Sequence, residues 1–430
     1  MKLVRRETND RGLRSGRRPG RLGRMIRKAS SRTALVLPGL LVGLTVVEGS
    51  ARWVFFGSLA APTGGVHYRQ PHEQLGWSLA PNATAYLRKF DYVNVVHINS
   101  KGFHDVEHTY TVPGERFQIL VLGDSFMEAY TEPLGGGFSQ LLERELSSRT
   151  ALDVEVINLG VGGYGTTQEY LLFQAEEVKY DPDLILLAFF GQNDVRDNPR
   201  ALEAAFHGGS GHYRVAVRPF LERVETGDWE LIGPDLNAAK ELLEERRVTV
   251  ARQHTPTGLE RFLLGQLLLR SIQAVAREER LLPGGAESMY GIYQVRPSRV
   301  WNEAWEATEE LLERLRDAVG QSGARLAVFS VPAACEADAA YWDHVVGGTP
   351  WLRQEVVDLE RPEARLAESL AGLEIPFRPL LGTFRDKLEE DGISLHHIYE
   401  DLHWNGRGHE LAARAVAGWL TGAGLLDINR

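Results

Sequence analysis

The chain has 430 residues, of which 43% are hydrophobic, so it is long enough for one large domain or two ordinary domains with a substantial core. Residues 1–32 contain twelve Lys or Arg against two acidic residues, a balance of +10, so the rest must sum to −20 for the total of −10. A body of that charge repels phosphate, which excludes nucleic acid from the expected partners. Cys335 is the only cysteine, so an intramolecular disulfide and a cysteine-based zinc site are excluded.

The basic segment leads directly into an apolar one. Thr33–Val47 contains fifteen residues without a charge, and the apolar character continues to residue 57 with Trp53, Phe55 and Phe56. Basic residues before such a run and aromatic residues after it are typical of a cytoplasmic flank and a membrane interface. We predict a disordered cytoplasmic tail over 1–32 and a single-pass transmembrane signal-anchor over 33–57. The rest of the chain would then lie on the periplasmic or extracellular side of a bacterial cytoplasmic membrane.

Two other interpretations of the apolar segment stay open. It is shorter than the roughly 20 apolar residues of a full span. It is compatible with a cleaved signal peptide, although Gly49-Ser50-Ala51 and Ser58-Leu59-Ala60 are weak cleavage sites. A buried core helix ranks third, because twelve basic residues rarely precede one. Met25 is an alternative start, which would leave a short basic segment before the anchor.

Two different patterns follow the anchor. Residues 58–75 are interrupted by Pro and Gly, which predicts a linker. Residues 76–112 alternate polar and apolar positions, which predicts short antiparallel lead-in strands to a domain that spans 76–430. From residue 117 the chain changes to uninterrupted apolar runs, which are typical of strands buried on both faces. These runs are Gln118–Leu122, Val154–Leu159, Leu184–Phe190, Arg325–Val331 and Ile375–Phe377.

Stretches with helical spacing of apolar residues separate and follow these runs. They are Phe138–Ser148, Thr167–Val178, Trp305–Gly320 and Gly408–Leu420. Alternating strands and helices predict an α/β fold, a doubly wound, flavodoxin-like, five-stranded parallel sheet sandwiched by helices. Residues 196–300 interrupt the alternation and predict an inserted cap, with helices around Ala238–Arg252 and Leu259–Arg277.

Reactive residue types follow the predicted strands. Gly123-Asp124-Ser125 follows the first strand, a glycine-rich segment that begins at Asn158 follows the second, and Gly191-Gln192-Asn193-Asp194 follows the third. Asp401-Leu402-His403-Trp404 follows the last. The carboxyl ends of parallel strands are the edge at which open α/β sheets bind ligands. Four such segments at one edge predict a site there.

Ester cleavage assigns a task to each of these segments. It requires a nucleophile, a base that takes its proton, and donors for the oxyanion. Ser125 can be the nucleophile, His403 the base, and Asp401 the group that orients the imidazole. The oxyanion donors would be the Ser125 N–H, the Gly163 N–H and the side-chain amide of Asn193.

These four segments resemble blocks I, II, III and V of the SGNH, or GDSL-type, hydrolase superfamily. The resemblance matches Ser125, Gly163, Asn193 and His403 to the family's serine, glycine, asparagine and histidine. The family's Asn-x-x-x-x-Gly pattern selects Gly163 over Gly160 or Gly162, with one position of slip left open. The acid departs from the common Asp-x-x-His spacing, which leaves Asp401 as the first choice and Glu400 as the reserve. Asp-x-His-Trp resembles membrane-anchored bacterial branches of the superfamily.

Metal and cofactor chemistry is not required by this assignment. His396, His403 and His409 do not follow a recognised zinc-ligand spacing. Gly160-Val161-Gly162-Gly163-Tyr164-Gly165 matches Gly-x-Gly-x-x-Gly, but it follows the second strand, and an acidic residue for a ribose is missing after the next. We therefore expect no metal and no cofactor.

The sequence thus predicts a serine esterase that removes an acyl group, acetyl by preference, from an oxygen ester on a carbohydrate or cell-envelope glycan. One alternative is an O-acyltransferase that passes the acyl group from the same serine to an exported polysaccharide. A second is a non-catalytic glycan-binding or assembly module, which would have no need of Ser125, His403 and Asp401 together. The sequence sets no expectation for the oligomeric state.

Overall fold

The computed structural model describes residues 39–40, 42–50, 68–88, 91–110, 116–206, 217–253, 289–398 and 401–427. The chain divides into two compact units, Met1–Pro62 with Thr257–Ile272, and Thr63–Pro256 with Gln273–Arg430. In the first unit, residues 39–40 and 42–50 are helical. Among the described residues, no helix has both the length and the apolar character that a membrane span requires. Most of the predicted anchor at 33–57 lies outside these residues, so the anchor stays a prediction.

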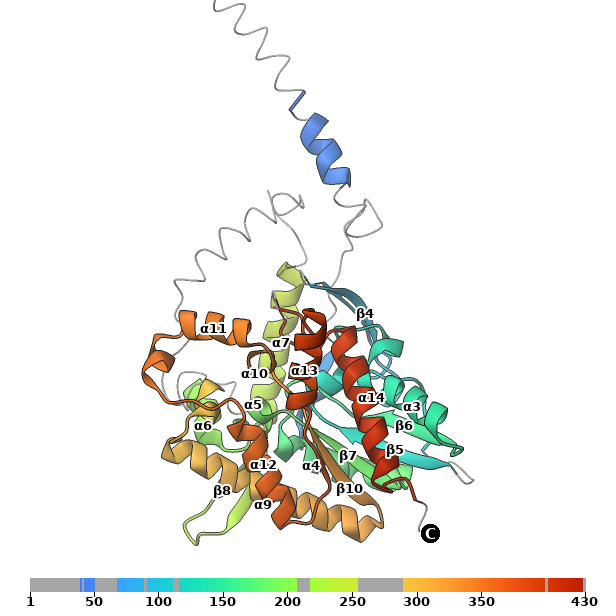
Figure 1. Cartoon of the computed structure of the whole chain (residues 1–430), viewed down its shortest axis with the longest axis vertical. Coiled ribbons are helices and arrows are strands. Elements are labelled where there is room, and N and C mark those ends of the chain that lie inside the picture. Colours follow the sequence, from blue (N-terminus) through green and yellow to red (C-terminus); the bar gives the residue numbers. More distant parts are fainter. Residues whose placement is uncertain are drawn as a thin grey trace, which may run out of the picture. The chain divides into compact units, whose positions relative to one another are not determined.

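A five-stranded parallel sheet organises the second unit (Figure 1). Its order is β11-β10-β7-β5-β6, and every neighbouring pair is parallel. The strands are β5 (Phe117–Leu122), β6 (Val154–Asn158), β7 (Leu184–Phe189), β10 (Arg325–Ser330) and β11 (Phe377–Arg378). The predicted α/β fold with a five-stranded parallel sheet is confirmed. Strand β6 pairs on one side of β5 and β7 pairs on the other, so the order of connection switches at β5. Ligands of open α/β sheets bind at the carboxyl ends of the strands at such a switch point.

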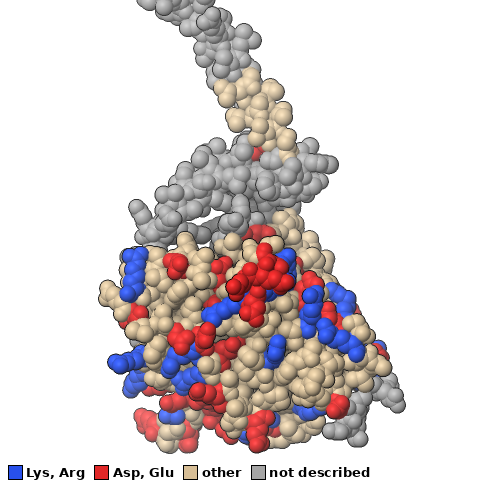
Figure 2. Space-filling model, viewed as in Figure 1, with Lys and Arg blue, Asp and Glu red and all other residues tan. Residues whose placement is uncertain are grey.

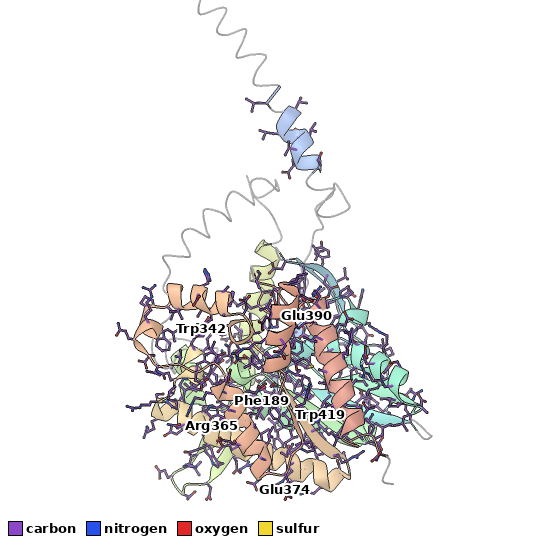
Figure 3. All side chains as sticks on the ribbon, viewed as in Figure 1. Phe189, Trp342, Arg365, Glu374, Glu390 and Trp419 are labelled. Carbon is purple, nitrogen blue, oxygen red and sulfur yellow. The ribbon has the colours of Figure 1, made fainter. Side chains whose placement is uncertain are left out.

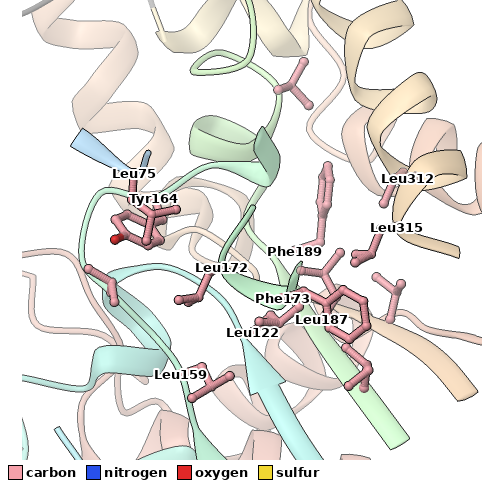
Figure 4. Packing of buried hydrophobic residues seen from close by; sticks show 14 of the residues in the cluster. Leu75, Leu122, Leu159, Tyr164, Leu172, Phe173, Leu187, Phe189, Leu312 and Leu315 are labelled. Atoms are coloured by element: carbon pink, nitrogen blue, oxygen red, sulfur yellow. The ribbon is translucent and has the colours of Figure 1, made fainter. Parts of the chain in front are cut away.

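Successive side chains of each strand enter two different cores, as the strand period of two requires. Leu120 and Leu122 of β5 pack in one core, and Ile119 and Val121 pack in the other. The first core contains α4 (Thr166–Tyr180) and α9 (Arg299–Ser322), and Figure 4 shows Phe173, Leu187 and Leu315 meeting there. The second contains α3 (Phe138–Arg149) and α14 (Gly406–Gly422), which carries Trp419 in Figure 3. Helices therefore cover both faces, which explains why the strands read as continuous apolar runs.

Local capping sets the ends of the long helices. The Ser298 side chain accepts a hydrogen bond from Trp301 N at the start of α9, which begins six residues before the predicted Trp305. This helix ends at Gly323, whose φ of +87° is the left-handed conformation that favours glycine. Asn405 caps α14 by accepting from the N–H groups of Arg407 and Gly408.

Two antiparallel hairpins precede the sheet. The first pairs β1 (Arg69–His72) with β2 (Gly76–Leu79), and the second pairs β3 (Thr84–Arg88) with β4 (Val93–His97). The first strand lies inside 58–75, so the expectation of a linker is wrong for residues 69–72. Its polar sequence with Pro71 has low intrinsic strand preference, so the strand is stabilised by its pairing with β2 rather than by its own residues.

The insert between α5 (Gly191–Asp194) and α9 contains its own structure. It comprises α6 (Arg200–Phe206), the β8–β9 hairpin (Phe220–Arg223 and Trp229–Ile232) and α7 (Leu236–Gln253). The last of these is the helix expected around Ala238–Arg252. The helix expected around Leu259–Arg277 lies outside the described residues. Because α7 packs against β1 and β2, the insert and the N-terminal hairpin form one wall of the unit.

Acidic and basic side chains are interspersed over the face of the molecule shown in Figure 2. Ion pairs between residues close in sequence, such as Lys387 with Glu390 and Arg316 with Glu313, occur in the described part of the chain. Such mixing does not produce a large field of one sign over this face.

Candidate active site

The backbone between β5 and the next helix places Ser125 at the carboxyl edge of the sheet. Strand β5 ends at Leu122, and α2 (Ser125–Glu128) begins three residues later. A Cβ at Gly123 would lie 2.5 Å from Met127 Cγ, so only glycine fits this close turn. Asp124 caps the short helix by accepting a hydrogen bond from Phe126 N at 2.9 Å. The Ser125 N–H has no acceptor among the described residues, which leaves it available to a bound group.

A hydrogen-bonded chain joins Ser125 to the opposite end of the sequence. His403 Nε2 lies 2.6 Å from Ser125 Oγ, and His403 Nδ1 is hydrogen-bonded to Asp401 Oδ1. The carboxylate fixes the tautomer in which Nδ1 carries the proton, so Nε2 is free to accept the serine proton. The geometry thus selects Asp401 as the partner of His403, whereas Glu400 lies outside the described residues.

The histidine is held by the loop in which it lies. Leu402 turns the backbone with a φ of +69°, a conformation that residues with a Cβ rarely adopt. Trp404, two residues after Leu402, is fully buried and donates through Nε1 to Pro332 O at 3.2 Å. The imidazole itself packs between the rings of Phe126 and Tyr130, at centroid distances of 4.7 and 5.2 Å. These contacts restrict the rotation of His403.

Two tyrosine hydroxyls donate to Asp401, whose side chain is only 2% exposed. Tyr92 donates to Oδ2 at 2.9 Å, and Tyr130 donates to Oδ1 at 3.3 Å and lies 3.2 Å from His403 Nδ1. Burial, followed by the charge of Asp401, raises the pKa of both tyrosines well above the ordinary value, so they remain protonated donors. Sequence reasoning missed both tyrosines, because Tyr92 lies 309 residues from Asp401 in a hairpin with no motif.

The glycine-rich loop after β6 presents a free N–H beside the serine. The Gly162 N–H donates to Glu128 Oε2 at 2.5 Å, whereas the Gly163 N–H has no acceptor among the described residues. Gly163 adopts a φ of +79°, and a Cβ at Gly162 would lie 3.5 Å from Ser125 Cβ. The loop therefore approaches the nucleophile, and it is Gly163 rather than Gly162 whose N–H can bind an oxyanion. This supports the alignment that selected Gly163.

Glu128 is the buried group that organises this loop, and sequence reasoning did not identify it. Besides the Gly162 N–H, its carboxylate accepts from the Tyr68 hydroxyl at 2.5 Å and lies 3.8 Å from Arg69 Nη2. A buried carboxylate is tolerated only when such donors surround it. Glu128 thus joins the N-terminal hairpin, the serine helix and the glycine loop.

Asn193 lies in α5, one turn after β7, with its amide held at both ends. Its Nδ2 donates to Asp124 Oδ2 at 2.6 Å, and its Oδ1 accepts from Arg196 Nη2 at 3.4 Å. These two partners define which end of the amide is which. One Nδ2 proton is left for a ligand, and the contact with Asp124 ties the amide to the residue that precedes Ser125.

His396, His409 and the single cysteine lie near the site in sequence or in space but do not take part in the chain from Asp401 to Ser125. His396 and His409 are buried, which lowers their pKa values to about 4 and about 3. Burial also raises the pKa of Cys335 to about 12. No group of three or more His, Cys, Asp or Glu side chains among the described residues is arranged to hold a metal ion.

The family model for the GDSL-like lipase/acylhydrolase family matches residues 121–411, more than half of the chain. The chain belongs to this family. It is therefore a hydrolase of ester bonds, and the matched range contains Ser125, Gly163, Asn193, Asp401 and His403. No curated protein matches this hydrolase.

Solved structures similar to the hydrolase have low sequence identity to it. An acetyl xylan esterase, AlAXEase, is 11% identical with a TM-score of 0.38, and the match covers 71% of this chain and 100% of that one. A lipase/acylhydrolase from Enterococcus faecalis is 12% identical with a TM-score of 0.35, covering 71% and 96%. A catalytic mutant of Axe2, an acetylxylan esterase from Geobacillus stearothermophilus, is 12% identical with a TM-score of 0.36, covering 74% and 97%.

Removal of the tyrosine hydroxyls should slow the hydrolase without weakening substrate binding. We expect Tyr92→Phe and Tyr130→Phe each to lower kcat by about tenfold, the worth of a hydrogen bond to a charged group, with little change in KM. Steady-state kinetics on p-nitrophenyl acetate measure this, with Tyr110→Phe, an exposed tyrosine away from the site, as the control. A folded double variant with the kcat of the wild type would contradict the role.

Burial raises the pKa of Asp124 from 3.8 to about 6, and its hydrogen bonds offset only part of this effect. Between these values the folded hydrolase holds a proton that the unfolded chain releases, so its stability should fall as pH rises through about 6. The free energy of unfolding of the wild type, relative to Asp124→Asn, should decrease by about 3 kcal/mol between pH 3 and pH 7. Urea denaturation across this range measures it, with Asp386→Asn as an exposed control. A pH-independent difference would refute the assignment.

Proposed function

We propose that this acylhydrolase removes a short acyl group, acetyl by preference, from an oxygen ester on a carbohydrate or cell-envelope glycan, with Ser125 as the nucleophile. The observation that carries the proposal is the chain from Asp401 through His403 to Ser125 Oγ, which ends in a 2.6 Å hydrogen bond. Nucleophile, base and orienting acid are thereby in the order that acyl transfer requires.

The reaction proceeds in two halves. His403 Nε2 takes the Ser125 proton as Oγ attacks the ester carbonyl carbon, and the new oxyanion accepts from the N–H groups of Ser125 and Gly163 and from Asn193 Nδ2. The imidazolium then gives its proton to the departing alcohol oxygen, which leaves an acyl-Ser125 ester. Water, deprotonated by His403, attacks this ester and releases the carboxylic acid and the serine. Asp401 stabilises the imidazolium in both halves.

Substitution of the nucleophile should abolish ester cleavage and leave the fold intact. We expect Ser125→Ala to lower kcat on p-nitrophenyl acetate by about 10⁴-fold or more, because the histidine then has no nucleophile to activate. Ser148→Ala, an exposed serine on α3, is the matched control and should retain full activity. Circular dichroism verifies folding. Wild-type activity in Ser125→Ala would rule out this mechanism.

The same experiment can follow the acyl group. Incubation of the wild type with an acetylated donor, with and without a polysaccharide acceptor, distinguishes free acetate from an acetylated acceptor by mass spectrometry. Free acetate as the main product in both mixtures is expected of an esterase. Accumulation of acetylated acceptor would identify the O-acyltransferase alternative, which uses the same three side chains.

We further propose that residues 33–57 anchor the enzyme in a bacterial cytoplasmic membrane, with the catalytic unit on the outer side. The twelve basic residues of 1–32 and the uncharged run Thr33–Val47 support this orientation. A reporter that is active only outside the cytoplasm, fused after residue 60, should be active and should sediment with membranes. The same fusion without residues 33–57 is the control. Reporter activity confined to the cytoplasm would contradict the orientation.

A further inference from the structure

A pocket of about 100 Å³ lies on the glycine side of Ser125. Three segments line it. The N-terminal hairpin contributes Arg69 and Trp77, the glycine loop contributes Gly163, and the insert contributes Arg218, Leu242 and Leu243. Two of these segments, the hairpin and the insert, take no part in the proton transfers of ester cleavage, so the pocket needs a separate explanation.

The pocket reaches the glycine loop, which lies beside Ser125. Gly163 is part of its wall, and a Cβ on the preceding Gly162 would lie 3.5 Å from Ser125 Cβ. Trp77 closes the wall beside this loop, because its Nε1 donates to Gly162 O at 3.3 Å and its Cζ2 would lie 3.5 Å from a Cβ on Gly163. Ser125 is not itself part of the wall, and the pocket adjoins it through Gly163, whose N–H is the proposed oxyanion donor.

The position of His403 decides which half of an ester enters. The departing alcohol oxygen receives its proton from His403 Nε2, so the alcohol must lie on the histidine side of the serine. Neither His403 nor Asp401, Tyr92 or Tyr130 lines the pocket. The other substituent of the carbonyl carbon, the acyl chain, points away from the leaving oxygen and hence toward the glycine side.

The walls suit a small uncharged chain. Leu242 and Leu243 of α7 are buried and present an apolar surface. Both arginines already face carboxylates. Arg218 lies 2.8 Å from Asp197 and 3.3 Å from Glu203, and Arg69 lies 3.8 Å from Glu128. The volume is well below the roughly 300–1,000 Å³ of pockets that enclose drug-sized ligands. Such a volume favours a short acyl chain over a fatty acyl chain.

We propose that this pocket binds the acyl chain of the substrate, and that Leu242 and Leu243 of the insert limit that chain to about two to four carbons. The inference rests on the proposed esterase activity and adds the residues that set its specificity. The insert then selects the acyl group, while the alcohol half is bound on the side of His403.

A chain-length series tests the pocket in the full-length protein. We expect the wild type to cleave p-nitrophenyl acetate and butanoate with kcat/KM at least about tenfold above that for octanoate. Leu242→Ala and Leu243→Ala should each lower this ratio by about tenfold, since one or two methylenes in an apolar pocket discriminate by that order. Leu231→Ala is the matched control, because Leu231 lies on β9 of the same insert, is 37% exposed and does not line the pocket.

The outcomes separate the pocket from the mechanism. A wild type that cleaves octanoate as well as acetate, or an unchanged ratio in folded Leu242→Ala and Leu243→Ala, overturns the acyl pocket and leaves the esterase assignment intact. Ester cleavage that survives in Ser125→Ala overturns the mechanism instead. If the alanine variants fail to fold, Ala239→Val narrows the same pocket and should lower kcat/KM for butanoate more than for acetate. An equal effect on both esters refutes the proposal.

Discussion

The hydrogen bond from Ser125 to His403 joins residues that are 278 positions apart, and the rest of the unit holds its two ends in place. The parallel sheet brings the end of β5 to the edge at which the last loop returns. Burial of Trp404 and capping of α14 by Asn405 then fix the loop that carries His403. A displacement of about 1 Å at either end would remove the hydrogen bond. The sheet, the loop and the final helix therefore act together to fix the positions of Ser125 and His403.

Two buried carboxylates hold the proposed oxyanion donors in place by accepting hydrogen bonds from groups around them. Asp124 accepts from Phe126 N and Asn193 Nδ2, and Glu128 accepts from Gly162 N and Tyr68. The N–H groups left without a protein acceptor are those nearest the nucleophile. Burying these charges costs free energy, which the hydrogen bonds and, at Glu128, Arg69 offset in part. The site is thus pre-organised by groups that never meet the substrate.

Local sequence patterns predicted the parts of this arrangement that have a local cause. The five apolar runs predicted the strands of the sheet because both faces of each are buried, and residues at strand ends predicted where Ser125, Asn193 and His403 would lie. The sequence did not predict strand β1 or the β8–β9 hairpin. Pairing with a neighbouring strand stabilises each of them, and their own residues show no strand periodicity. The roles of Tyr92, Tyr130 and Glu128 were not predicted from the sequence for a related reason. Their roles depend on partners that only the folded chain brings near, and their residue types carry no motif.

The division between the sheet edge and the added segments has a functional consequence. The groups to which the proposed mechanism assigns proton transfer or oxyanion binding come from the ends of β5, β6 and β7 and from the last loop. The α/β architecture places these segments together at one edge of the sheet. Groups that surround them come from the N-terminal hairpins and the insert. Tyr92 donates a hydrogen bond to Asp401. Tyr68 donates one to Glu128, and Arg69 lies near the same carboxylate. Helix α7 contributes to the wall of the pocket beside Gly163. In the proposed mechanism, changes in these segments alter rate and acyl selectivity while the order Asp401, His403, Ser125 stays the same.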